Sequence, residues 1–125
     1  MTAKRILVVE DEEELNELLA YNLRKAGYEV TQTFDGAHAL TLIAEDPPDL
    51  LLLDIMLPGQ DGWSVCRALA KQGAELPTII FTAKGAREEF DQARDFPNVR
   101  GYFMKPYATA DVLRHVERVL PVSGS

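Results

Sequence analysis

Five residues whose side chains suit the handling of an anionic group follow or end four apolar runs of the sequence. Glu10 and Asp11 follow the first run, Asp54 follows a run of leucines, Thr82 ends a third run, and Lys105 follows the last. A carboxylate can attack phosphorus and form an acyl phosphate. Transfer of a phosphoryl group to a carboxylate depends mainly on positioning and on neutralising charge. These residue types therefore suggest a site that accepts a phosphoryl group, if the fold brings them together.

The acids of this set are also suited to hold a divalent cation. Magnesium prefers oxygen ligands and keeps several of its waters, so Asp11 and Asp54 are expected as ligands, with Glu10 acting through water. Lys105 would supply a fixed positive charge to a phosphoryl oxygen, and Thr82 would supply a hydroxyl donor. Crowding three carboxylates is expected to raise the pKa of at least one of them in the metal-free protein. The expected cofactor is Mg²⁺.

The segments around these residues alternate between strand and helix patterns. Short aliphatic runs alternate with segments of helical period, which is typical of a parallel sheet covered by helices on both faces. The first, third and fourth runs are almost unbroken, as in central strands, whereas the second alternates, as at an edge. The sequence predicts an α/β fold with five strands: Arg5–Val9, Tyr28–Thr33, Asp49–Leu53, Thr78–Thr82 and Arg100–Met104.

Five helices are predicted between and after these strands. The first has Asp11 as its expected N-cap, with Glu14 three residues later, and ends at Gly27. The fourth, over residues 86–96, has the weakest apolar face, and we expect it to be mobile. The other three are marked by Asp35-Gly36 and Pro47-Pro48 at the two ends of the second, by Trp63, Cys66, Leu69 and Ala70 in the third, and by Val112, Val116, Val119 and Leu120 in the fifth.

The carboxyl ends of the strands are where the candidate side chains are expected to meet. In an open parallel sheet, ligands bind beyond these ends, at the point where the strand order reverses. Turn residues follow Asp54, which is therefore expected to be exposed at the rim of the sheet. The Lys105-Pro106 bond is a candidate cis peptide. Taken singly, each candidate has an ordinary structural role, such as a helix cap or a solvated strand end, but their joint placement favours the functional interpretation.

Length and composition are typical of one acidic domain. The chain has 125 residues, of which 46% are hydrophobic, and we assign residues 1–121 to one domain and 122–125 to a flexible tail or the start of a linker. The net charge of -7 argues against direct binding of nucleic acid. No apolar stretch is long enough to span a membrane and no signal pattern opens the chain, so a cytoplasmic protein is expected. Cys66 is the only cysteine, no zinc-binding spacing is present, and packing is its expected role.

Four motifs together resemble the receiver domains of bacterial response regulators, over Arg5 to Leu120. The resemblance implies a flavodoxin-like, three-layer α/β/α fold with strand order 2-1-3-4-5, as in chemotaxis receivers. It also implies a protein of two-component signalling. The motifs are Val8-Val9-Glu10-Asp11-Glu12, Leu53-Asp54-Ile55-Met56-Leu57-Pro58-Gly59 with Asp61-Gly62-Trp63, Phe81-Thr82-Ala83-Lys84, and Met104-Lys105-Pro106-Tyr107.

The resemblance implies a role for each residue of the acidic site. Asp54 would be the phosphoacceptor, and Glu10 and Asp11 would be the acid pair that helps to hold Mg²⁺. Met56 would be a further metal ligand through its backbone carbonyl. The donor would be a phosphohistidine on a sensor histidine kinase or a histidine phosphotransfer protein.

The resemblance further implies a switch formed by Thr82 and Tyr102. Thr82 would move toward the phosphoryl oxygens, and the ring of Tyr102 would enter the vacated space. The surface of the fourth helix, fifth strand and fifth helix would then change and be read by a downstream effector domain or protein. Residues 93–101 depart from the family pattern, and Arg100 stands near an acid that some receivers use to dimerise. That dimer is therefore disfavoured, and the expected state is a monomer or a phosphorylation-dependent homodimer.

Three other functions are alternatives to that of a phosphoacceptor. A phosphatase that passes through an aspartyl phosphate needs an acid two residues after the nucleophile, where this chain has Met56. The chain is therefore expected to catalyse only its own phosphorylation and dephosphorylation. A flavin or nucleotide carrier needs a small or Gly-rich phosphate loop after the first strand, where Glu10-Asp11-Glu12 would repel phosphate. A phosphorylation-independent interaction module of the same fold stays open because of the unusual segment 93–101.

Overall fold

The computed structural model describes residues 3–57, 61–83 and 93–122. Strands and helices alternate along the described chain, and the strand bounds differ from the predicted ones by one residue at most. The predicted fourth helix lies mainly on residues 84–92, outside the described ones. The elements are β1 (Arg5–Val9), α1 (Glu13–Lys25), β2 (Glu29–Thr33), α2 (Gly36–Glu45), β3 (Leu50–Asp54), α3 (Gly62–Lys71), β4 (Thr78–Thr82), β5 (Val99–Met104) and α5 (Thr109–Val119).

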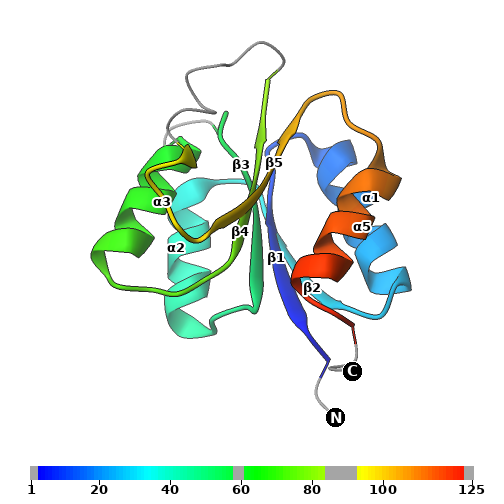
Figure 1. Ribbon diagram of the computed structural model, residues 1–125, viewed down its shortest axis with the longest axis horizontal. Helices are drawn as coiled ribbons and strands as arrows, with labels where there is room; N and C mark the ends of the chain where they lie inside the picture. Colours follow the sequence, from blue (N-terminus) through cyan, green and yellow to red (C-terminus); the bar gives the residue numbers. More distant parts are fainter. Residues whose placement is uncertain (1–2, 58–60, 84–92, 123–125) are drawn as a thin grey trace.

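The five strands form one parallel sheet in the order β2-β1-β3-β4-β5, which confirms the predicted fold. Helices α2 and α3 cover one face of the sheet, and α1 and α5 cover the other (Figure 1). The strand order reverses between β1 and β3, because β2 lies outside β1 and the later strands add on the other side. The carboxyl ends of β1 and β3 are thus neighbours at the point where a ligand is expected.

The core consists of two apolar clusters, one on each face of the sheet. Alternate residues of a strand point to opposite faces, so Leu51 and Leu53 join the cluster under α2 and α3, whereas Leu50 and Leu52 join the one under α1 and α5. All residues of β3 and β4 are buried, as expected for central strands. β2 has exposed residues along its length, as expected for an edge. This double covering holds the strand ends rigidly.

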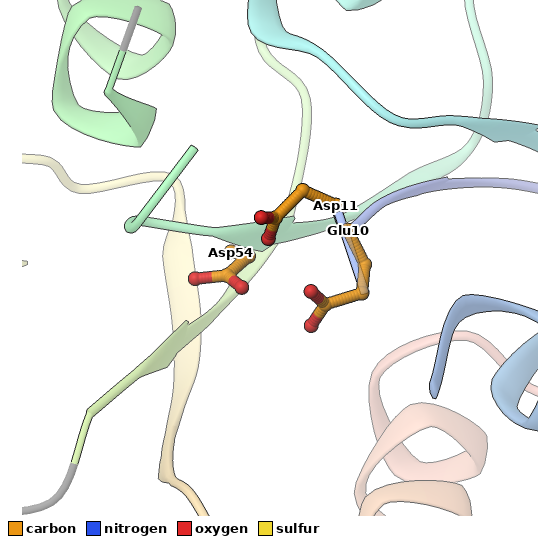
Figure 2. Close-up of side chains that lie close together, drawn as sticks. All are labelled: Glu10, Asp11 and Asp54. Atoms are coloured by element: carbon orange, nitrogen blue, oxygen red, sulfur yellow. The ribbon is translucent and has the colours of Figure 1, made fainter. Parts of the chain in front are cut away.

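The start of α1 differs from the prediction. The first backbone bond of the helix runs from the Asn16 amide to the Glu12 carbonyl, 2.9 Å, so Glu12 and not Asp11 is the N-cap. Asp11 precedes the helix, and its carboxylate turns toward Asp54 (Figure 2). The predicted cap was wrong because this side chain takes part in a contact between strand ends, which a local sequence pattern does not reveal.

The predicted end of α1 and the predicted ends of α2 agree with the structure, and α3 has a capping acid for which no prediction was made. The Asp35 carboxylate accepts a hydrogen bond from the His38 amide and caps α2, and Asp61 caps α3 through the Ser64 amide. Gly27 follows α1 with a positive φ of 111°, which is the stop that its residue type indicated. Among the described residues, no helix is long and apolar enough to cross a membrane.

Candidate functional site

Three carboxylates from two neighbouring strands converge at the carboxyl edge of the sheet. Val9 pairs with Leu53 in the β1–β3 ladder, so the next residues, Glu10 and Asp54, lie level with each other. Each of Glu10, Asp11 and Asp54 places a carboxylate oxygen within 4.8 Å of the others. Figure 2 shows the three side chains pointing toward one another. The tertiary structure thus brings together the three acids that the sequence singled out.

Asp54 is buried, in contrast to the exposed position predicted for it. Its exposed fraction is 1%, and both of its carboxylate oxygens are engaged. Oδ1 accepts a hydrogen bond from the Met56 amide at 2.8 Å, and Oδ2 lies 2.7 Å from the Lys105 ammonium nitrogen. The prediction was wrong because the turn residues after Asp54 indicate only local exposure. The two partners of the Asp54 carboxylate are Lys105, directly after β5, and Met56, which follows β3.

Lys105 is the cation at the centre of the acidic cluster. Its Nζ lies 2.7 Å from Asp54 Oδ2, 2.9 Å from Glu10 Oε1 and 3.0 Å from Glu12 Oε1. Burial by itself lowers the pKa of Lys105, but the hydrogen bonds to Asp54, Glu10 and Glu12 outweigh it, so the pKa lies above its ordinary value. Lys105 therefore stays charged and bonds the carboxylate of Asp54 directly. The predicted cis bond to Pro106 is also present.

The carboxyl of Glu10 has the raised pKa that was expected for one acid of a crowded cluster. The pKa of its carboxyl is raised to about 7, mainly by burial and also by the nearby Asp54, while hydrogen bonds from the Glu12 amide and Lys105 oppose the shift. The expectation of a raised pKa is confirmed. Burial is the main cause, however, rather than the repulsion between carboxylates from which the expectation was drawn.

Thr82 lies at the end of β4 beside this cluster and is fully buried, with 0% exposed. Its carbonyl accepts the Lys105 amide at 2.8 Å, which ties the ends of β4 and β5 together. Its hydroxyl has no hydrogen-bond partner within the described ranges 3–57, 61–83 and 93–122. A buried hydroxyl without a partner is costly, so it stands ready to donate to a group that enters the site.

Tyr102 lies on the same face of the sheet as Thr82. The register pairs Ile80 with Tyr102 and Thr82 with Met104, and side chains two residues apart on a strand point to the same face. The Tyr102 ring is half-buried and packs against the cluster under α2 and α3. The two residues of the predicted switch are therefore near neighbours on adjacent strands, while their movement stays a prediction.

Two contributors to the site were not recognised in the sequence. Glu12 belongs to the first family motif but was given no role in the site, and its carboxylate, although 62% exposed, pairs with Lys105. Asn16 is buried in α1 and bonds the backbone carbonyl of Glu10. Asn16 lies three and four residues before the apolar residues Leu19 and Ala20, on the face of α1 that is buried, and this position was the available signal.

The donor set fits a small divalent cation. Three carboxylates supply the hard oxygen ligands that magnesium prefers. Lys105 pairs with Glu10, Glu12 and Asp54, and Asp11 lies beside Glu10 and Asp54, so the carboxylates of the cluster outnumber this ammonium group and favour further positive charge. Met56, the fourth predicted ligand, is adjacent and binds Asp54 through its amide, whereas the role of its carbonyl stays a prediction.

Comparisons with known proteins agree with this geometry. A family model described as the response regulator receiver domain matches residues 6–117. The receiver domain of the Francisella response regulator 1452 is similar, with 27% identity, a TM-score of 0.86, and coverage of 93% of this chain and 95% of that one. The chemotaxis response regulator CheY4 of Vibrio cholerae has 25% identity and a TM-score of 0.85, over 95% of this chain and 100% of that one.

A longer protein contains a similar domain. NtrX from Brucella abortus has 33% identity and a TM-score of 0.84, and the match covers 96% of this chain but 27% of the NtrX chain. A domain of this kind thus occurs both alone and as part of a larger polypeptide.

Proposed function

Because this chain belongs to the family of response regulator receiver domains, we propose that it accepts a phosphoryl group on Asp54 from a phosphohistidine of a partner kinase or phosphotransfer protein. The proposal includes Mg²⁺ dependence and a cytoplasmic location. The observation that carries it is the placement of Asp54, whose carboxylate lies beside those of Glu10 and Asp11 and is paired with Lys105. A carboxylate in this position is aligned by hydrogen bonds and lies next to a fixed positive charge.

The transfer itself is assigned to an oxygen of Asp54. This oxygen attacks phosphorus, the new P–O bond forms as the P–N bond of the phosphohistidine breaks, and the leaving imidazole takes up a proton. Lys105 is already within 2.7 Å of Oδ2 and follows the charge onto the incoming phosphoryl oxygens. The unpaired Thr82 hydroxyl is the second donor available to these oxygens.

Glu10, Asp11 and Asp54 are the residues assigned to hold Mg²⁺. When bound, the ion supplies positive charge that offsets the repulsion between these carboxylates and the anionic phosphoryl group. The excess of acids over ammonium groups in the cluster supports this assignment.

The response of the domain is assigned to Thr82 and Tyr102. A bond from the Thr82 hydroxyl to the phosphoryl group satisfies a donor that now has no partner among the described residues, which supplies free energy for the switch. We infer that Tyr102 follows and that the surface around β5 and α5 is read by an effector domain or protein. We also infer that the chain modifies only itself, because Met56 stands where a turnover enzyme needs an acid.

Mass spectrometry of the intact protein tests the proposal. Incubation with magnesium and acetyl phosphate, a small phosphodonor, is expected to add the mass of one phosphoryl group. The adduct is expected to be absent in Asp54→Asn and in the presence of EDTA. Asp61→Asn is a matched control that changes an acid in the following loop, where it caps α3, and is expected to retain the adduct. Failure of the wild-type protein to form any adduct with this donor or with a phosphorylated kinase would refute the proposal.

A further inference from the structure

A buried asparagine joins α1 to the backbone of the acidic site. Asn16 has 0% exposure and lies in the first turns of α1, on the side that faces the sheet. We propose that Asn16 is a positioning residue of the receiver site, which holds the backbone that carries Glu10 and Asp11. The inference rests on the proposed function, because these acids are the ones assigned to the Mg²⁺ site.

The carboxamide of Asn16 connects the ends of two strands. Its Nδ2 donates to the Glu10 carbonyl at 2.9 Å, just after β1, and to the Thr33 carbonyl at 3.0 Å, at the end of β2. Its Oδ1 accepts a hydrogen bond from Gln32 Nε2 at 2.8 Å. Both donor hydrogens and the acceptor are thus used, and Gln32 keeps the carboxamide from turning over.

The position of these bonds determines what they control. The carbonyl of Glu10 belongs to the peptide group that joins Glu10 to Asp11, so Asn16 holds the link between the two acids. The Glu10 amide is held as well, since it donates to the same Thr33 carbonyl at 3.2 Å. With its amide and its carbonyl both fixed, the backbone of Glu10 has little freedom, and the direction of the Asp11 side chain depends on it.

The choice of asparagine here is difficult to explain by packing alone. The neighbouring buried positions of α1, Leu19, Ala20 and Leu23, are apolar. Asparagine is a poorer helix former than leucine, and a buried carboxamide must be fully hydrogen-bonded to offset its desolvation. Leucine has the same number of heavy side-chain atoms, branched at the same carbon, and would suit the helix better. The polar contacts to the acidic strand end are what asparagine supplies and leucine does not.

Groups that do not bind a metal themselves but orient its ligands strongly influence the affinity for the metal. Replacing such a group typically weakens metal binding by about 10- to 100-fold. We therefore expect Asn16→Leu to fold and to bind Mg²⁺ about 10- to 100-fold more weakly than the wild type. We also expect its phosphorylation to approach the wild-type rate when magnesium is raised to saturation, because the acceptor and Lys105 are unchanged.

Calorimetric titration with Mg²⁺ measures the affinity, and amide hydrogen exchange in EDTA reports the backbone at residues 10–12 without any metal. Faster exchange at these amides in Asn16→Leu, together with the weaker Mg²⁺ binding, would support the positioning role. Asn22→Leu is the matched control on the same helix. Within the described part of the chain, the Asn22 carboxamide bonds its own helix, at the Leu18 carbonyl, so this variant is expected to keep both wild-type values.

A purely structural role for Asn16 predicts a different result. It would lower the melting temperature in EDTA while leaving the Mg²⁺ affinity and the exchange at residues 10–12 unchanged, and this would overturn the inference. Should Asn16→Leu fail to fold, Gln32→Ala tests the same contact by removing the bond that orients the carboxamide, with a smaller effect in the same direction. Failure of the proposed function would appear separately, as an absence of Mg²⁺ binding by the wild type.

Discussion

At the residue scale, the carboxylate of Asp54, the proposed phosphoacceptor, is already paired with a cation of the chain itself. Lys105 bonds Asp54, Glu10 and Glu12, and the Met56 amide bonds the other oxygen of Asp54. The sequence assigned Lys105 to a phosphoryl oxygen, but before transfer it binds the nucleophile. An entering cation or phosphodonor must therefore compete for Asp54. The protonation of Glu10, which also pairs with Lys105, therefore affects the free energy of unfolding.

The raised pKa of Glu10 leads to a prediction about pH. Between about 4.5 and about 7, the folded metal-free protein retains a proton on Glu10 that the unfolded chain has already released. The free energy of unfolding is therefore expected to fall as pH rises through this window, and Glu10→Gln is expected to reduce that decline. Urea unfolding in EDTA at a series of pH values measures it. Glu13→Gln, a change of an acid in the first turn of α1, is the control, and an equal slope in Glu10→Gln and the wild type would contradict the prediction.

At the scale of elements, the start of α3 packs directly on the backbone of the acceptor. The Gly62 amide donates to the Ile55 carbonyl at 2.9 Å, and a Cβ at Gly62 would lie 2.7 Å from the Asp54 carbonyl oxygen and from Ile55 Cα. These neighbours are backbone atoms and cannot turn aside. The position of Asp54 therefore depends on the close approach of α3, which only glycine allows.

Gly62→Ala is expected to destabilise the protein by about 1–3 kcal/mol, the usual cost of overpacking. Because the shift falls on the backbone of Asp54, the rate of phosphoryl transfer is expected to fall as well. Gly73→Ala is the comparison. Gly73 has a φ of 71° with nothing within 4 Å of an added Cβ, so its cost is that of the left-handed backbone, about 1–2 kcal/mol. Its transfer rate is expected to be unchanged, and equal transfer rates in both variants would argue against the role of α3.

At the scale of the whole molecule, negative charge is concentrated in the first half of the chain, which includes β1 and β3. The first 62 residues include 13 acids and 4 basic residues, and three of these acids form the site. The sheet, covered on both faces, holds them together despite their repulsion. Repulsion between the three carboxylates thus lowers the free energy of unfolding. A cation that binds only the folded state should offset this loss.

Magnesium is therefore expected to raise the melting temperature. At a free concentration of about 100 times Kd, binding adds about 2.7 kcal/mol to the free energy of unfolding. Differential scanning calorimetry with and without EDTA measures the change. Asp11→Asn is expected to lose most of it, whereas Glu14→Gln, in the first turn of α1, should keep it. A wild-type melting temperature that is insensitive to magnesium would show that the metal site is wrongly assigned.

Much of the fold was predictable because its signals are local. Unbroken apolar runs mark β1, β3 and β4, while glycines and capping acids mark the ends of the helices, and these features depend on neighbours in the chain. The rule that ligands bind beyond the carboxyl ends of parallel strands then indicated Glu10, Asp11, Asp54, Thr82 and Lys105 as neighbours. The segment around 84–92 lies outside the described residues, and its predicted helix stays a prediction.

The sequence alone thus indicated the layered α/β fold and, through its resemblance to a known family, the strand order, together with the three acids that the structure brings together. Only the tertiary structure decided that Asp54 is buried rather than exposed, that Asp11 faces the site instead of capping α1, and that Glu12 and Asn16 belong to the site. The physical reason is that burial, ion pairing and the pKa of Glu10 depend on groups from several elements that meet at one edge of the sheet. Such contacts follow from register and from side-chain direction, which the order of residues in the chain does not encode locally.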